Sequence, residues 1–126
     1  MDINLRDVHA ELCAAFVRYE DALVHNKVDV LDTLFWPSEF TVRYGVGENL
    51  RGIDAIRAFR AARPALGLAR TLQNTVITTF GRDFGTAMTE FQRDGSARSG
   101  RQSQTWVRFP TTGWRVVAAH VSLLGA

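Results

Sequence analysis

Arginine supplies most of the side chains in this sequence that could do chemistry. Fourteen of the fifteen basic residues are arginine, with Lys27 as the single lysine. A guanidinium keeps its proton, and its planar fork of donors suits carboxylate and phosphate groups. The basic residues are spread among apolar segments and form no single run or stripe, so the sequence does not favour nucleic-acid binding.

Two arginines are candidates for a binding site, and a tyrosine on the first predicted helix is more simply explained as a core residue. Arg43 alternates with apolar residues, so it lies on a solvated strand face or, if both faces are covered, beside an anionic partner, because an unpaired buried charge is costly. Arg70 opens a predicted strand and is either a carboxylate anchor or a surface strand end. Tyr19 lies on an apolar helical stripe, which from the residues alone favours a core tyrosine whose hydroxyl is hydrogen-bonded.

Polar residues on two later strands are further candidates. Gln102 and Gln104 share a predicted strand face with Trp106, which indicates either a hydrogen-bonding pocket wall or an outer face or dimer contact. His120 has apolar neighbours near the end of the chain, which favours a structural histidine, although substrate binding stays open. These residues are the candidate substrate-binding group, together with Arg70.

The sequence offers no pattern typical of a metal or nucleotide site. His9 and His25 are sixteen residues apart, and His120 is remote from both, so metal-ligand spacing is lacking. Residues 45–49 contain two glycines but do not form a phosphate-binding loop. Cys13 is the only cysteine, with no obvious histidine partner, so neither a disulfide within the chain nor a nucleophilic thiol is expected. We therefore expect no metal and no cofactor.

Helices are predicted in the first half of the chain. Apolar residues at spacings of three and four predict an amphipathic helix over residues 5–25, with Asn4 as its N-cap. A second helix is predicted over 28–35, and a third lies between Gly52 and Pro64. Arginines on this third helix are expected to form a solvated face. Between the second and third helices, residues 40–44 alternate as a strand.

Four long strands are predicted after residue 69. They cover residues 70–80, 84–93, 100–109 and 114–124, and the short turns between them predict an antiparallel meander. Helices separate from an antiparallel sheet make an α+β fold. We expect a curved sheet covered by three helices on one face, which gives a cone with one closed end.

The apolar pattern of the last predicted strand indicates a partner subunit. Alternation places Val116, Ala118 and His120 on one face and Val117, Ala119, Val121 and Leu123 on the other. Both faces are largely apolar, whereas a solvated face would be polar. We therefore expect helices on one face and a second copy of the chain on the other, in a homodimer.

Length and composition predict a single cytoplasmic domain. The chain has 126 residues, of which 46% are hydrophobic and 22% charged, as in folded globular proteins. No apolar run approaches the roughly 20 residues of a membrane span, and the N-terminus lacks the pattern of a signal peptide. We expect one domain over residues 1–126, without contact with a membrane.

Two hairpin segments carry a family resemblance. Residues 100–108 (GRQSQTWVR) and 113–122 (GWRVVAAHVS) resemble the closing hairpin of SnoaL-like proteins in the nuclear-transport-factor-2-like superfamily. The resemblance implies a cone-shaped α+β fold of the cystatin-like type. It does not define an activity, because the superfamily includes isomerases, cyclases, dehydratases and modules without catalysis.

A narrower resemblance covers the first half of the chain. Residues 35–36 (FW), 41–50 (TVRYGVGENL), 59–60 (FR), 63–64 (RP) and 68–70 (LAR), with Gly52 and Ile56, resemble the branch that includes the 1,3-dicarboxyurea decarboxylase of bacterial cyanuric acid catabolism. The resemblance implies a cofactor-free decarboxylase that converts 1,3-dicarboxyurea to allophanate and CO2. It also implies that Tyr19 donates a proton or hydrogen bond and that Arg43 anchors a carboxylate.

Two other functions remain open at this stage. The chain is alternatively a non-catalytic module that binds small carboxylates or assembles into oligomers. It is also compatible with an acid–base isomerase or dehydratase, which needs a pocket base such as Asp83, Glu90, Glu48 or His120.

Overall fold

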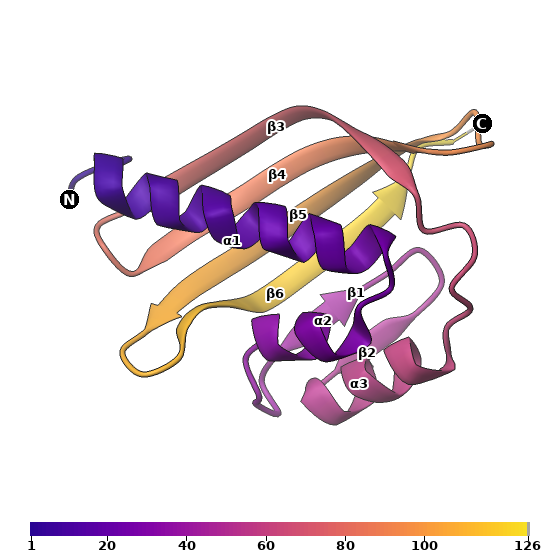
Figure 1. Cartoon of the computed structure of the whole chain (residues 1–126), viewed down its shortest axis with the longest axis horizontal. Helices are drawn as coiled ribbons and strands as arrows, with labels where there is room; N and C mark the ends of the chain where they lie inside the picture. The colour runs from indigo at the N-terminus through magenta and orange to yellow at the C-terminus, as the bar shows by residue number, and fades with distance from the viewer. Residues whose placement is uncertain (126) are drawn as a thin grey trace.

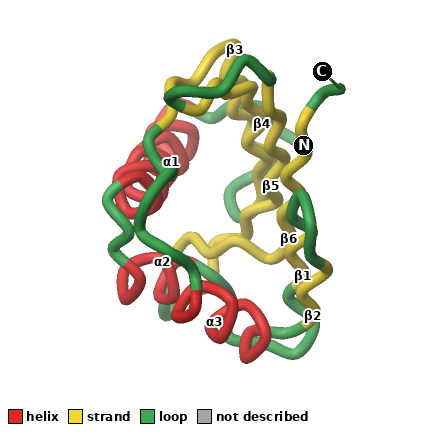
Figure 2. The backbone as a smooth tube through the Cα atoms, turned by 90° about the vertical axis from the view of Figure 1, so that its right-hand side faces the viewer, coloured by secondary structure: helices red, strands yellow, loops and turns green. Residues whose placement is uncertain are grey.

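The computed structural model describes residues 1–125 and shows a curved sheet with three helices on one of its faces (Figure 1, Figure 2). The helices are α1 (Arg6–Val24), α2 (Val28–Leu34) and α3 (Ile53–Ala62). The strands are β1 (Val42–Tyr44), β2 (Asn49–Arg51), β3 (Arg70–Phe80), β4 (Phe84–Arg93), β5 (Ser99–Phe109) and β6 (Gly113–Leu123). The predicted α+β class is confirmed, and each of the three predicted helices is present.

The sheet has six strands in the order β2-β1-β6-β5-β4-β3. Strands β3 to β6 form the predicted antiparallel meander, because short turns join each strand to the next. Strand β1 pairs parallel to β6, with Arg43 opposite Ala119. Strand β2 was not predicted; its three residues pair with β1 in a hairpin. This hairpin brings residues from the middle of the chain beside the C-terminal strand.

The start of α1 differs from the prediction. Leu5, not Asn4, is the N-cap, and no side chain caps the helix. Asn4 adopts a left-handed backbone conformation with φ 55°. Its Oδ1 accepts a hydrogen bond from the Thr79 amide at 2.8 Å, and its own amide donates to the Thr79 carbonyl at 3.0 Å. The Asn4 side chain therefore joins the N-terminus to β3 instead of capping the helix.

A β-bulge in β6 corrects the predicted facing of the last strand. Thr105 pairs with Ala118 and Trp106 pairs with Val116, so Val117 is an extra residue on β6. From this point on, the side chains of β6 no longer follow the strict alternation between the two faces of the sheet. Val116 faces the helices and is fully buried, whereas Ala118 and His120 lie on the outer face. The homodimer through that outer face stays a prediction.

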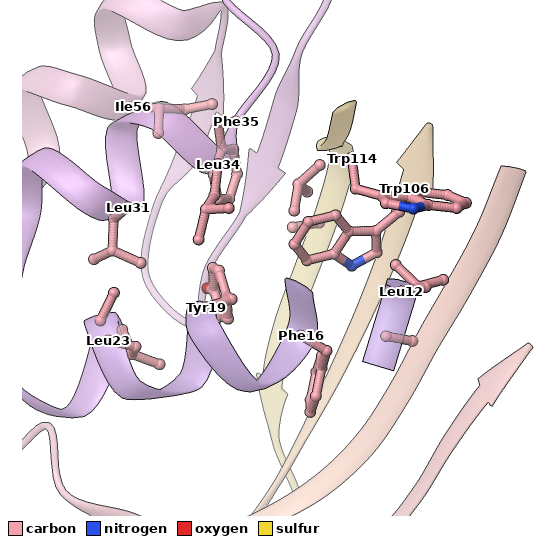
Figure 3. Close-up of a cluster of buried hydrophobic side chains, with 14 of the residues drawn as sticks. Leu12, Phe16, Tyr19, Leu23, Leu31, Leu34, Phe35, Ile56, Trp106 and Trp114 are labelled. Carbon is pink, nitrogen blue, oxygen red and sulfur yellow. The ribbon is translucent and has the colours of Figure 1, made fainter. Parts of the chain in front are cut away.

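The core lies between α1, α2 and the inner face of the sheet (Figure 3). The α1 stripe contributes Val8, Leu12, Phe16, Tyr19 and Leu23, all buried as the helical spacing predicts. Trp106 is completely buried, and its indole Nε1 donates to Gln104 Oε1 at 2.9 Å. This packing fixes one long side of α1 against the sheet.

The prediction that the arginines of α3 form a solvated face is wrong for Arg60. Only 3% of Arg60 is exposed; its Nη1 donates to Asp32 Oδ1 at 3.2 Å, and its guanidinium lies 4.1 Å from the ring centre of Phe35. The ion pair and the cation–π contact allow this charge to be buried. Arg57 is exposed, as expected. Within residues 1–125, no helix is both long enough and apolar enough to cross a membrane.

Candidate functional site

A cavity of about 210 Å³ opens between the end of α1, the β1–β2 hairpin, the end of α3 and the inner face of the sheet. Four arginines line it: Arg43, Arg63, Arg70 and Arg93. The other lining residues are Tyr19, Leu23, Val46, Glu48, Phe59, Leu68, Gln102 and Val121. The cavity is smaller than the roughly 300–1,000 Å³ of sites for drug-sized ligands, so it suits a small polar molecule.

Tyr19 reaches this cavity from the buried stripe of α1. Only 3% of the residue is exposed. Its ring packs edge-on against Trp106, with centres 6.4 Å apart, and lies 6.1 Å from Phe35 (Figure 3). Such aromatic contacts hold the ring in one orientation. The phenol is therefore held rigidly at the cavity wall, with the hydrophobic core behind it.

Arg43 lies on the inner face of β1, between β2 and β6. The sheet covers one side of it and the helices the other, so the charge needs a partner, as the sequence indicated. Glu48 is that partner, because Arg43 Nη1 donates to Glu48 Oε1 at 2.9 Å. A Cβ at Gly45 would overlap the Glu48 carboxylate, so glycine at this position leaves room for the ion pair.

Arg70 also lines the cavity, but most of its donors are already bonded. Its Nε and Nη2 donate to the two Glu20 oxygens at 2.8 and 2.7 Å, and Nη2 also donates to Gln102 Oε1 at 3.0 Å. The ring of Phe91 lies 4.5 Å from its guanidinium. The prediction that Arg70 anchors a substrate carboxylate stays a prediction. Within the protein, the carboxylate that Arg70 binds is that of Glu20.

Gln102 and Gln104 have different positions despite sharing a strand face. Gln102 is 2% exposed and lines the cavity. Gln104 is 1% exposed and lies in the core, bonded to Trp106 and outside the cavity lining. The Nε2 atoms of both amides are buried without a hydrogen-bond partner.

His120 lies away from the cavity. It is exposed on the outer face of β6, with its ring edge-on to Tyr44 at 5.8 Å. It borders a separate depression on that face, together with Glu90 and Arg101. Of the six predicted site residues, the structure thus brings Tyr19, Arg43, Arg70 and Gln102 together, and it places Gln104 and His120 elsewhere.

Among the charged residues of the cavity, the prediction missed Arg63 and Arg93, and it considered Glu48 only as a base for the isomerase alternative. Arg63 was expected on a solvated helix face, but it follows the last turn of α3 with φ −74° and ψ 134°. This extended conformation, typical of a residue before proline, takes its side chain off the helix face. The Arg63-Pro64 pair was the available signal. Burial lowers the pKa of Arg63, and it also lowers the pKa of Arg93.

Residues able to hold a metal are not gathered at this site. Within the described residues 1–125, no three His, Cys, Asp or Glu side chains are grouped so that they could share a metal ion. The polar groups of the cavity are guanidinium, amide, phenol and carboxylate, which bind anions and carbonyl groups through hydrogen bonds.

The curved sheet with three helices on one face is the cystatin-like, nuclear-transport-factor-2-like fold. A superfamily protein from Salmonella enterica serovar Typhimurium has this fold, with a TM-score of 0.76 at 24% identity over 95% of this chain and 93% of that one. Within that class, the chain belongs to the AtzH-like family, whose sequence model matches residues 1–126.

Two solved structures are much more similar. A protein of unknown function from the DUF3225 family of Pectobacterium atrosepticum is 63% identical, with a TM-score of 0.96, over 98% of this chain and 96% of that one. A cystatin-like fold protein from Burkholderia xenovorans is 48% identical, with a TM-score of 0.95, over 100% of this chain and 98% of that one. No curated protein matches the sequence.

Proposed function

We propose that this protein is a cofactor-free decarboxylase that converts 1,3-dicarboxyurea to allophanate and CO2. The observation that carries the proposal is that Tyr19 and Arg43, which are far apart in the sequence, line one small cavity with three further arginines. Membership of the AtzH-like family supports the same substrate class.

The reaction needs little from the protein beyond binding and one proton. The C–N bond between the departing carboxyl carbon and the urea nitrogen breaks, its electron pair stays on nitrogen, and CO2 leaves. Nitrogen gains a proton, so the product is allophanate, a monocarboxylate with a terminal urea NH2 group. Because the urea nitrogen accepts these electrons once it is protonated or hydrogen-bonded, no additional electron sink is needed.

Tyr19 is the group that we assign to proton donation. Its hydroxyl is a positioned acid held at the cavity wall by Phe35 and Trp106. Solvent then returns the proton to Tyr19.

Arg43 is the group that we assign to the departing carboxylate. Its guanidinium is shared with Glu48, so its hold on a substrate carboxylate is weaker than that of an unpaired arginine. A weaker hold is useful here, because strong binding of the carboxylate that leaves would stabilise the substrate more than the transition state. The apolar neighbours Leu23, Phe59 and Val121 favour neutral CO2 at this end of the cavity.

The acid–base isomerase alternative has fewer residues available. Glu90 lies on the outer face, and the Asp83 side chain is 71% exposed in a turn. Glu48 alone among the predicted bases borders the cavity, and it is bonded to Arg43.

The test is CO2 release from 1,3-dicarboxyurea by purified protein. We expect release faster than in buffer, and loss of the enhancement in Tyr19→Phe and Arg43→Met. The matched controls are Tyr44→Phe, at the other tyrosine of the chain, and Arg57→Met, at an exposed arginine; both should retain the activity. Equal rates for wild type, Tyr19→Phe and buffer would overturn the proposal, and ligand binding without turnover would favour a carboxylate-binding module.

A further inference from the structure

Two nitrogens of the Arg63 guanidinium are buried without a partner, although the residue as a whole is half-buried. Its Nε and Nη2 atoms are shielded from solvent and form no hydrogen bond within the described residues. Burial of these two N–H donors is unfavourable, because they have lost hydration and gained no acceptor. Arg63 lies on the wall of the cavity, so a ligand there can supply what the protein does not.

The nearby carboxylates are already bonded to other arginines. Glu48 pairs with Arg43 at 2.9 Å, Glu20 with Arg70 at 2.7 Å, and Asp32 with Arg60 at 3.2 Å. Each of these pairs is largely buried, so exchange of a carboxylate to Arg63 would leave another arginine unpaired. The folded chain therefore leaves Arg63 for a group that comes from outside.

The charges around the cavity show how much anion it can accept. Four guanidiniums line it, and two carboxylates, Glu48 and Glu20, are paired with Arg43 and Arg70. Arg63 and Arg93 form no ion pair within residues 1–125, so two positive charges stay unbalanced. A ligand with two negative charges balances them, whereas a monocarboxylate leaves one half-buried positive charge without a counterion.

Gln102 supplies a second unused donor on the same wall. Its Oε1 accepts from Arg70 Nη2, which fixes the orientation of the amide. Its Nε2 is buried and has no partner. An amide N–H held in this way is suited to a neutral acceptor, such as a carbonyl oxygen between two carboxylates.

We propose that Arg63 is the anchor for the carboxylate that the substrate retains, and that the cavity selects a small dicarboxylate over a monocarboxylate of the same length. This inference rests on the proposed function only for the identity of the substrate. Arg63 suits the retained end because no protein carboxylate shares its charge, while Arg43 and Tyr19 face the end that leaves. Gln102 Nε2 donates to the carbonyl between them.

Calorimetric binding of two unreactive probes tests the proposal. Glutarate has a chain of the same length as 1,3-dicarboxyurea, and pentanoate has that length with one carboxylate. We expect wild type to prefer glutarate and Arg63→Gln to weaken glutarate binding by about 10–100-fold, the value of a charge-assisted contact, with little change for pentanoate. Arg63→Lys, which keeps the charge, should retain part of the preference, and Arg57→Gln should retain all of it.

The outcomes separate this proposal from the decarboxylase assignment. If Arg63→Gln binds glutarate like wild type, or if wild type binds both probes equally, the anchor is refuted. If wild type binds glutarate through Arg63 and releases no CO2 from 1,3-dicarboxyurea, the decarboxylase fails and the anchor stands. If CO2 is released and Arg63→Gln changes neither KM nor glutarate affinity, the anchor fails and the decarboxylase stands.

Discussion

Glu48 decides how freely Arg43 can bind a ligand, because the two side chains form an ion pair at the edge of the cavity. In the substitution Glu48→Gln, the negative charge disappears while the size of the side chain is kept. If Glu48 is the internal counterion of Arg43, it competes with a ligand carboxylate for Arg43 and repels that carboxylate in the wild-type protein. The substitution removes both effects. We expect glutarate to bind roughly 5-fold more tightly or better.

The same substitution should reduce stability. Removing one partner of a fully buried ion pair costs about 3–5 kcal/mol. Here the side chains of Arg43 and Glu48 are 11% and 24% exposed, and glutamine still accepts a hydrogen bond. We therefore expect a loss of about 1–2 kcal/mol, which for a chain of this length corresponds to a fall in Tm of roughly 4–8 °C.

The assay is calorimetric binding of glutarate together with thermal unfolding of the empty protein. Glu39→Gln is the control, because it makes the same charge change at an exposed position near the hairpin. Tighter binding with lower stability supports the counterion role. Weaker binding together with loss of turnover would refute it, because that result would make Glu48 a group that acts on the substrate, as the isomerase alternative requires.

Three further predictions concern other parts of the structure. In Gly100→Ala the new Cβ meets the ring of Phe91, so we expect a loss of about 1–3 kcal/mol of stability in denaturant unfolding. We also expect a higher KM, because the Phe91 ring contacts the guanidinium of Arg70 at the cavity. In Gly47→Ala the new Cβ meets no atom, so this control should be close to neutral. In Arg63→Met two buried guanidinium nitrogens without partners are removed, so the empty protein should gain about 1 kcal/mol while losing glutarate binding; a loss of stability would contradict this reasoning. Burial raises the pKa of the Cys13 thiol, so its reaction with a disulfide reagent at pH 8 should be slower than that of free cysteine and should reach the free rate in urea; a fast native reaction would contradict this.

The sequence predicted the long elements well because their signals are local. The stripe of α1 and the four strands after residue 69 are defined by residues close in the sequence, and the bounds of β3 and β4 match the prediction. The β-bulge at Val117 and the three-residue strand β2 were missed, because both depend on pairing with a distant strand. One bulge reversed the facing of Ala118 and His120, which moved His120 out of the candidate site.

The site was predicted only in part, for a related reason. Tyr19 and Arg43 were selected by family resemblance, and the structure brings them to the same cavity. Charge pairing was not readable from the sequence, since Glu20 and Arg70 are fifty residues apart. Without that pairing, Arg70 was left as either a carboxylate anchor or a surface strand end, and Arg63, two of whose nitrogens lack a partner in the described residues, was assigned to a solvated face.

A crystal structure of the Tyr19→Phe variant with glutarate bound would show directly whether the cavity holds a dicarboxylate between Arg63 and Arg43. We expect glutarate in the cavity beneath α1, with one carboxylate at Arg63, the other beside Arg43, and position 19 facing the second. Glutarate bound on the outer face near His120, or a cavity without glutarate at a concentration that saturates binding in solution, would contradict this expectation.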